Sequence, residues 1–172
     1  MTTERRHPNV VNQDEVEATE FAKGKHHTKN RRFGPASGSQ QLGAMLTELP
    51  PGARSFPFHY HCANEEALYV VSGTGTARIG DARVAVRPGD WIALPAGEAY
   101  AHQLLADRGE AITYLAISTM SEVDVVTYPD SDKILVGVIA PEPGMRKIFH
   151  LSAGNVSYWE GEGNPPLPKD AV

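Results

Sequence analysis

Two histidines separated by one residue, His59 and His61, begin the stretch of this sequence that is best suited to chemistry. In a β-strand, residues i and i+2 point to the same face, so both imidazoles can be presented to one point. An acidic pair, Glu65 and Glu66, follows and precedes a β-rich run that ends at Gly73. Imidazole and carboxylate together suit zinc, iron, manganese, nickel or copper. The stretch therefore predicts a metal site.

Glu66 is the better candidate ligand of the two acids. A six-residue run separates it from Gly73, where the chain turns back into a hairpin. Glu65 lies one step away and points to the opposite face of the strand. Cys62 would coordinate a soft metal, but it is out of register with both histidines, and we expect it to be a small buried or half-buried residue.

A second block downstream can supply a fourth ligand. Residues 89–97 form a turn-rich segment, and His102 follows on a predicted strand. One short hairpin separates this segment from Gly73 and returns the chain beside the first block, so antiparallel pairing would bring His102 to the other ligands. Tyr100 shares the face of His102 at i−2 and either lines the mouth of the site, where it would bind substrate, or packs in the core.

The segments that must position these residues are short and β-like. Gly and Pro are frequent, with 16 and 13 copies, and turn formers between short apolar runs favour an all-β domain. We predict strands at residues 41–49, 55–61, 67–72, 74–79, 82–87, 91–94, 100–105, 110–118, 125–128, 134–138 and 147–151. The aromatic residues expected in the core are Phe56, Phe58, Trp91 and Tyr114. With no long helix and no internal repeat in the pattern, we predict a single β-sandwich or barrel.

One hairpin can be assigned by register. Residues 80–81, Gly and Asp, fit a two-residue turn of type I′ or II′, which pairs Ile79 with Ala82. The same register places Arg78 opposite Arg83, a mildly unfavourable pairing of like charges. Either nearby acids offset this pairing or that face meets an anion.

The chain divides into three parts by composition. Residues 1–38 are polar, contain a basic run at 23–32 and predict an N-terminal arm. Residues 39–128 form the predicted barrel core, and 129–172 a C-terminal extension that packs on or near it. The basic run either contacts phosphate or nucleic acid, or is a solvated arm lying on an acidic body or a partner subunit. We favour the second interpretation, because no segment the size of a helix-turn-helix precedes the run.

Composition also limits the class of protein. A chain of 172 residues is long enough for one domain with a substantial core. A net charge of -5 and a pI near 5.8 argue against a nucleic-acid partner. The single cysteine excludes an intrachain disulfide and fits a reducing compartment. No apolar run approaches the ~20 residues of a membrane span, and the N-terminus lacks the apolar core of a signal peptide, so we expect a soluble cytoplasmic protein without a membrane partner.

The two histidine-bearing blocks resemble the paired motifs of the cupin superfamily, whose members are small jelly-roll barrels built as a double-stranded β-helix. The matching residues are Gly52, His59, His61, Glu66 and Gly73 for the first motif, and Gly89, Pro95, Gly97 and His102 for the second. The resemblance covers residues 40–118, and the remainder resembles a poorly characterised bacterial subgroup of cupins. The spacing is one residue longer than usual before His59 and two longer before His102, and Ala106 stands where an asparagine is often found. We therefore expect a bulged or extended loop before His102.

The resemblance implies one divalent transition metal ion (Fe, Mn, Ni or Zn) held by His59, His61, Glu66 and His102. Three imidazoles and a carboxylate leave one or two coordination positions open, which distinguishes catalytic from structural sites. This implies a metal-dependent enzyme of the dioxygenase, isomerase or decarboxylase type that acts on a small oxygen-rich molecule. The alternative is a non-catalytic cupin that binds or senses a small ligand such as a sugar or an organic acid.

Two further partners follow from the same resemblance. Small cupins usually dimerise, so a homodimer is implied, and the arm at 1–38 is a candidate for crossing to the second subunit. A transcription regulator would need a DNA-binding domain, which residues 1–38 do not offer.

Overall fold

The fold is all-β, as predicted. The computed structural model describes residues 7–138 and 146–151, the last segment by its backbone. Its strands are β1 (Thr19–Lys23), β2 (His26–Arg32), β3 (Leu42–Leu49), β4 (Tyr60–His61), β5 (Glu66–Ser72), β6 (Gly75–Ile79), β7 (Ala82–Val86), β8 (Trp91–Leu94), β9 (His102–Ala106), β10 (Ile112–Thr119), β11 (Val123–Tyr128), β12 (Lys133–Val138) and β13 (Arg146–Leu151). Helical segments within the described residues are short: the helix α1 (Phe33–Ser37) and the 3-10 turns η1 (Gln13–Glu15), η2 (Glu98–Tyr100) and η3 (Pro129–Ser131).

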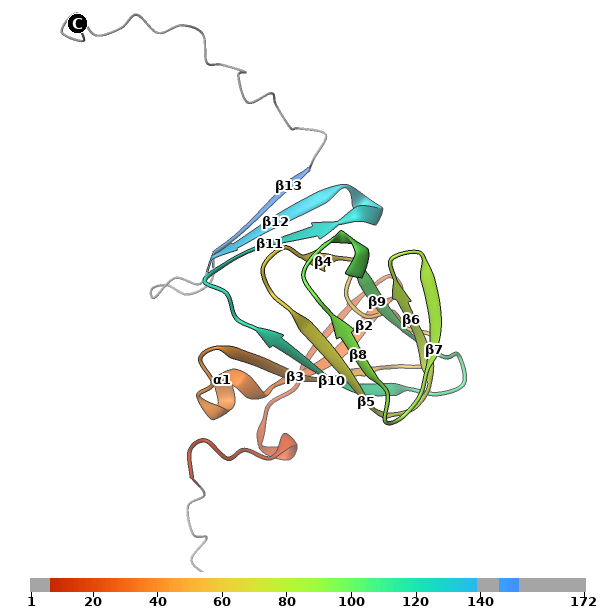
Figure 1. The fold of residues 1–172 in the computed structure, drawn as a ribbon. Coiled ribbons are helices and arrows are strands. Elements are labelled where there is room, and N and C mark those ends of the chain that lie inside the picture. The colour runs from red at the N-terminus through yellow and green to blue at the C-terminus, as the bar shows by residue number, and fades with distance from the viewer. Residues whose placement is uncertain (1–6, 139–145, 152–172) are drawn as a thin grey trace, which may run out of the picture.

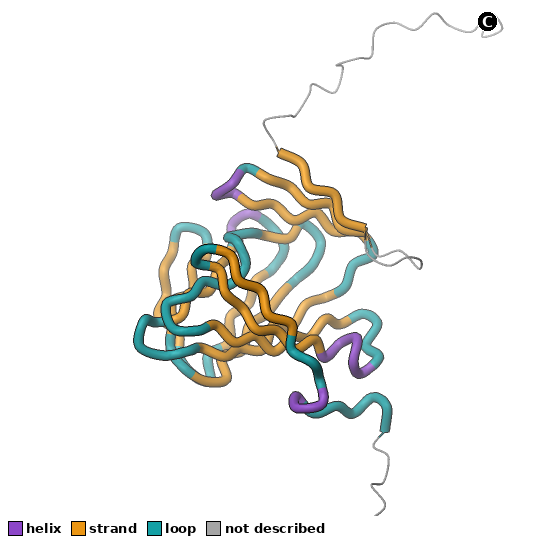
Figure 2. The backbone as a smooth tube through the Cα atoms, turned by 180° about the vertical axis from the view of Figure 1, so that it is seen from behind, coloured by secondary structure: helices purple, strands orange, loops and turns teal. Residues whose placement is uncertain are grey.

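The strands form three sheets that together make a barrel with a covered end. The six-stranded sheet has the order β1-β2-β3-β10-β5-β8, and the three-stranded sheet the order β7-β6-β9. A four-stranded sheet, β13-β12-β11-β4, lies at one end of the barrel (Figure 1). The view from behind shows the same mostly stranded body (Figure 2). None of the helices in the part of the chain described here is long and apolar enough to cross a membrane.

The core lies between the six-stranded and three-stranded sheets. Leu68 and Val70 of β5 alternate with exposed Tyr69, which is the period-two pattern of a strand with one buried face. Phe58 and Tyr114 are buried as predicted. The prediction for Trp91 is wrong, because it is 58% exposed. The wholly apolar run of β8 does not reveal which of its alternate residues face inward.

Gly73 closes the first motif because the backbone leaves no room for a side chain. Its φ is 75°, in the region that favours glycine. A Cβ at this position would lie 1.9 Å from the carbonyl oxygen of Ala111. The turn after β5 therefore requires glycine, and this turn sets where β6 returns along the barrel.

The β6–β7 hairpin has the predicted register, with Arg78 opposite Arg83. Of its two turn residues only Gly80 has a positive φ, 52°, which fits the type II′ turn. An acid offsets the like-charge pairing: Asp130 of η3 accepts hydrogen bonds of 2.6 and 2.9 Å from the two terminal nitrogens of Arg78. The hairpin is thereby tied to the β11–β12 connection.

The second half of the predicted arm is part of the six-stranded sheet. β2 lies between β1 and β3 and buries Thr28 and Asn30. Asn30 donates a hydrogen bond of 2.8 Å to Thr28 and accepts one of 3.0 Å from Thr47. The interpretation of residues 23–32 as a solvated arm is therefore wrong. Polar side chains that satisfy one another in the interior look like surface residues in a hydropathy pattern.

Two predicted strands are shorter than expected. The strand at 55–61 is reduced to β4, since Pro57 has no N–H to give to a ladder. The strand at 100–105 begins at His102 and is preceded by η2. The domain boundaries at residues 38 and 128 stay predictions, although β11 and β12 pair with each other across the second one.

Candidate metal centre

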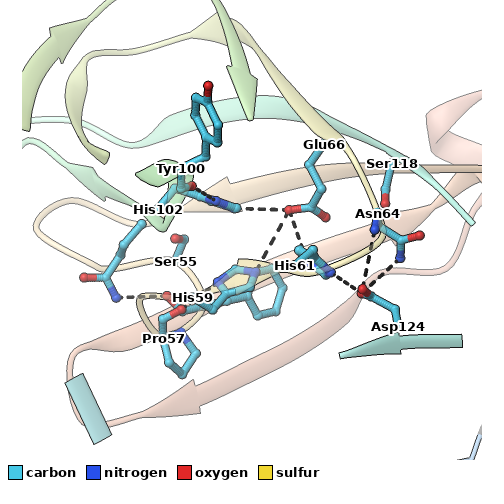
Figure 3. A network of polar contacts seen from close by, with 12 residues as sticks. Ser55, Pro57, His59, His61, Asn64, Glu66, Tyr100, His102, Ser118 and Asp124 are labelled. Atoms are coloured by element: carbon cyan, nitrogen blue, oxygen red, sulfur yellow. Dashed lines mark hydrogen bonds and ion pairs between the residues drawn. The ribbon is translucent and has the colours of Figure 1, made fainter. Parts of the chain in front are cut away.

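The two motifs meet at the end of the barrel below β11. His59 lies directly opposite His102 in an antiparallel bridge. The two residues exchange backbone hydrogen bonds, with N···O distances of 3.2 Å from His59 to His102 and 2.7 Å in return. Side chains of such a pair lie on the same face. His61 ends β4, Glu66 begins β5 and His102 begins β9, so three strands and the bridge residue His59 contribute to one point (Figure 3).

Three imidazole nitrogens converge on one oxygen of Glu66. The Nε2 atoms of His102, His61 and His59 lie 3.1, 3.4 and 4.0 Å from its Oε2. Ligand atoms of His59, His61 and Glu66 are all within 4.8 Å of one another, so these three residues can hold a metal ion. We call these three residues and His102 the four-residue cluster.

Each imidazole of the cluster is oriented from outside by its other nitrogen. Nδ1 of His59 donates to the carbonyl oxygen of Pro57 at 2.8 Å, and Nδ1 of His102 donates to that of Tyr100 at 3.1 Å. Nδ1 of His61 donates to the carboxylate of Asp124. Because carbonyl and carboxylate oxygens only accept, each Nδ1 carries a proton and each Nε2 faces the cluster. This is the arrangement of histidines that ligate metals.

Burial and hydrogen bonding shift the pKa values of the cluster residues in different directions. Burial lowers the pKa of His59 to about 4, with a contribution from neighbouring His102. Burial would raise the pKa of Glu66, but hydrogen bonds from His102 and His61 outweigh it and hold that pKa well below its ordinary value. Burial would likewise lower the pKa of His61, but hydrogen bonds to Glu66 and Asp124 raise it to about 9. At neutral pH and without metal, His59 is neutral, Glu66 is an anion and His61 is a cation.

Asp124 is a buried carboxylate beside the cluster that the sequence interpretation missed. It lies on β11, is 7% exposed and accepts a hydrogen bond from Nδ1 of His61. It also accepts hydrogen bonds from the backbone N–H of Ala63 at 3.0 Å and from the side-chain amide of Asn64 at 3.2 Å. An acid flanked by Val123 and Val125 was the available signal, since one charged residue in an apolar run needs a buried partner.

A cavity of about 330 Å³ opens beside the cluster. His59, His61 and Glu66 line it on one side, and β11 and β12 contribute Asp124, Val126, Tyr128, Leu135 and Gly137. The ring of Tyr128 stacks on that of His59, with centroids 5.9 Å apart and planes at 26°. The four-stranded sheet thus covers the cluster and leaves a space for a small molecule.

The remaining predicted residues lie outside the cluster. Tyr100 is in η2 and not on a strand, it is 41% exposed, and its phenol points away from the cluster (Figure 3). η2 takes up the extra residues before His102, so the loop is extended as expected. Glu65 is exposed, whereas Glu66 faces the three imidazoles. Cys62 is exposed, so the expectation of burial is wrong. A role of Tyr100 in substrate binding stays a prediction.

The chain is similar to known proteins in sequence and in fold. Residues 45–118 match the family model described as a cupin domain. Two solved structures, each 25% identical with a TM-score of 0.72, cover 87% of this chain. One is from Acidithiobacillus ferrooxidans and is covered over 96% of its chain; the other is from Silicibacter pomeroyi and is covered over 97%. The first is named "putative sugar phosphate isomerase" and the second "sugar phosphate isomerase from a cupin superfamily".

A more distant match shows the fold alone. A polyketide cyclase from Streptomyces resistomycificus is 22% identical, with a TM-score of 0.57 over 65% of this chain and 79% of its own. No curated protein matches the chain in sequence.

Proposed function

Since this chain is a cupin-domain protein, we propose that its four-residue cluster holds one divalent transition metal ion and that the protein is an enzyme. His59, His61, Glu66 and His102 would be the ligands, and Fe, Mn, Ni and Zn all suit this set. One observation carries the proposal: three Nε2 atoms face a single carboxylate oxygen while every Nδ1 donates outward. Histidines that served only to stabilise the fold would not need this common direction.

The reaction is of the dioxygenase, isomerase or decarboxylase type on a small oxygen-rich molecule. When bound, a divalent ion with these four ligands has one or two positions left for substrate oxygens, which it polarises as a Lewis acid. The protein orients the ligands: Asp124 accepts a hydrogen bond from the ring of His61, and Tyr128 stacks on that of His59. The names of the two structures at 25% identity support the isomerase type.

The second candidate is a non-catalytic protein that binds or senses a small ligand. It is favoured by the side chains of the cavity. Among the lining residues described, Asn64 and Asp124 hydrogen-bond to each other. Asp124, which also accepts from His61, is therefore engaged within the protein and is not free to act on a ligand, so binding without turnover fits the same geometry.

Metal analysis of the purified full chain tests the site. We expect about one transition metal ion per chain by plasma mass spectrometry, and loss of that metal from the double variant His59→Ala/His61→Ala. His27→Ala is the matched control, because His27 pairs with Glu20 at 2.6 Å and is not in the cluster. Unchanged metal content in the double variant would remove the basis of the proposal.

A turnover screen separates the two candidates. The chain is loaded in turn with iron, manganese, nickel and zinc and incubated with sugars, hydroxy acids and keto acids, and products are followed by NMR. Product formation that the double variant lacks supports the enzyme. Tight binding of one of these compounds without product under any metal would favour the binding protein.

We also propose that the chain forms a homodimer. β1 is an edge strand of the six-stranded sheet, and all five of its residues are exposed, including Phe21 at 47%. An unpaired strand edge with an exposed aromatic residue is suited to association. Light scattering of the full chain should give twice the mass of one chain, and a monomer at all concentrations tested would overturn this proposal.

A further inference from the structure

The wall of the cavity that faces the cluster comes from β11 and β12. Asp124, Val126 and Tyr128 alternate along β11, so they share one face, and all three line the cavity. On β12, Leu135 lies opposite Val126 and Gly137 lies opposite Asp124. The wall is therefore a paired two-stranded surface and not a loop.

Most of this wall is apolar. Val126 and Leu135 form a cross-strand pair, each 7% exposed. The apolar or aromatic lining residues are Phe56, Pro57, Met120, Val126, Tyr128 and Leu135. A ligand in the cavity would therefore place its body against hydrocarbon and an aromatic ring, and only its end near the cluster would meet polar groups.

Three polar side chains of the lining, Asn64, Ser118 and Asp124, already hydrogen-bond within the protein. Asn64 donates to Asp124 at 3.2 Å and accepts from the backbone N–H of Ser121 at 2.8 Å. Ser118 donates its hydroxyl to the carbonyl oxygen of Thr119 at 2.8 Å. The several hydroxyls of a sugar would lose water here and find few groups free to bind them, which is unfavourable.

The charges of the cavity also argue against a phosphate. No Lys or Arg is among the described residues that line it. Lys133 approaches the same wall, but its ammonium lies over the ring of Tyr128, 5.1 Å from the centroid. The carboxylates of Glu66 and Asp124 balance the two positive charges of a divalent ion, so a phosphate dianion would find no excess positive charge and none of the Arg or Lys groups that recognise it.

We propose that the cavity takes a substrate with a small oxygen-bearing end, which binds the metal, and a flat apolar body, which lies on the β11–β12 wall. The apolar wall and the lack of Lys or Arg in the described lining disfavour a phosphorylated sugar as the substrate. This inference rests on the proposed function and narrows its substrate class.

Three 2-hydroxy acids that differ only at C3 test the inference: lactate, phenyllactate and 3-phosphoglycerate. Binding to the zinc-loaded full chain is measured by isothermal titration calorimetry. We expect phenyllactate to bind about thirtyfold more tightly than lactate, through burial of its ring, and 3-phosphoglycerate to bind no more tightly than lactate. Val126→Thr should weaken phenyllactate about fivefold and leave lactate unchanged, because a hydroxyl is placed in the apolar wall. Val125→Thr on the other face of β11 is the matched control and should change neither.

Two results would overturn the inference: 3-phosphoglycerate binding as tightly as phenyllactate, or no binding of any of the three acids to the metal-loaded chain. Failure of the proposed function has a different signature, which is the absence of metal uptake. In that case the metal-free chain is tested with two compounds that lack the metal-binding acid group, one aromatic and one phosphorylated. If saturation-transfer NMR shows that 2-phenylethanol binds more strongly than glycerol 1-phosphate, the apolar wall is supported. Stronger binding of glycerol 1-phosphate contradicts it.

Discussion

Two groups of charged side chains lie one residue apart on the β6–β9 ladder, the four-residue cluster and the Arg78–Asp130 pair. Their hydrogen bonds are arranged differently. Ile79 pairs with His102 of the cluster, and the next pair is Arg78 with Gln103, so Arg78 and His102 point to opposite faces. On the inner face, three imidazoles share one carboxylate. On the outer face, Arg78 and Asp130 are joined by two hydrogen bonds, and the guanidinium lies 3.4 Å from the centre of the Phe58 ring.

The difference lies in where the hydrogen bonds point. The Arg78–Asp130 pair is closed, because its bonds run from one member to the other, and it fastens η3 to the barrel. The cluster is open, because its outer bonds orient three Nε2 atoms toward a common point that suits a cation. A group of charged residues is thus recognised as a metal site by the hydrogen bonds that direct its ligand atoms to one point, more than by which residue types it contains.

Removing the carboxylate of the cluster should have the largest effect. Glu66→Gln keeps the shape but removes the negative charge on which the three histidines converge. We expect zinc affinity to fall by at least about a hundredfold, more than the loss of an orienting partner would cause, in a competition assay with a chromophoric chelator. Glu65→Gln is the matched control, since Glu65 is adjacent and exposed, and it should stay within about twofold. Equal losses in both variants, with unchanged circular dichroism, would contradict the assignment of Glu66.

The orienting carboxylate should come next. Asp124→Asn weakens the hydrogen bond that fixes the ring of His61 and places an amide among the N–H donors of Ala63 and Asn64. We expect zinc affinity to fall by about 10- to 100-fold. Asp130→Asn removes a carboxylate of the closed pair and should leave zinc affinity unchanged. Equal zinc affinity for Asp124→Asn and the unmodified chain would contradict the claim that Asp124 orients His61 for metal binding.

The cluster could be predicted from the sequence because local rules place its members. The i, i+2 spacing puts His59 and His61 on one face, and the turn at Gly73 selects Glu66 over Glu65. Asp124 could not be found in this way. It lies 63 residues from His61, and only the pairing of β11 with β4 brings them together. No local spacing specifies which strand will cover a barrel end.

The same limit explains the errors in the fold. Burial of Thr28 and Asn30 depends on Thr47, which belongs to another strand. Trp91 is exposed because it lies on the outer face of β8, opposite exposed Tyr69 of β5, whereas the run from 91 to 94 is apolar at every position. Pattern alone assigns a strand there but not its inner face.

Metal binding should depend on pH through His61. Its pKa of about 9 in the metal-free protein means that it carries a proton at neutral pH, and a metal at Nε2 must displace that proton. Zinc affinity should therefore rise about tenfold per pH unit up to about pH 9 and level off above it. In Asp124→Asn the pKa of His61 should be lower, so the plateau should begin at a lower pH. A flat profile between pH 6 and 8 would show that His61 is already neutral.

The closed pair should give the smallest effect, and on stability instead of metal binding. Asp130 is 53% exposed at its side chain, so its pairing with Arg78 is screened by solvent, and Asp130→Asn should lower the free energy of unfolding by about 0.2–1 kcal/mol at pH 7. The hydrogen bond from Arg78 holds the pKa of Asp130 below its ordinary value of 3.8. This contribution is therefore present above that value and is lost as the pH falls below it. Urea unfolding of the metal-free proteins at pH 7 and pH 3 should show the difference at the first pH and a smaller one at the second, with Asp81→Asn in the exposed hairpin turn as the matched control. Loss of zinc affinity together with stability in Asp130→Asn would mean that the fastening of η3 also shapes the cluster, because η3 follows directly on Tyr128, which covers His59.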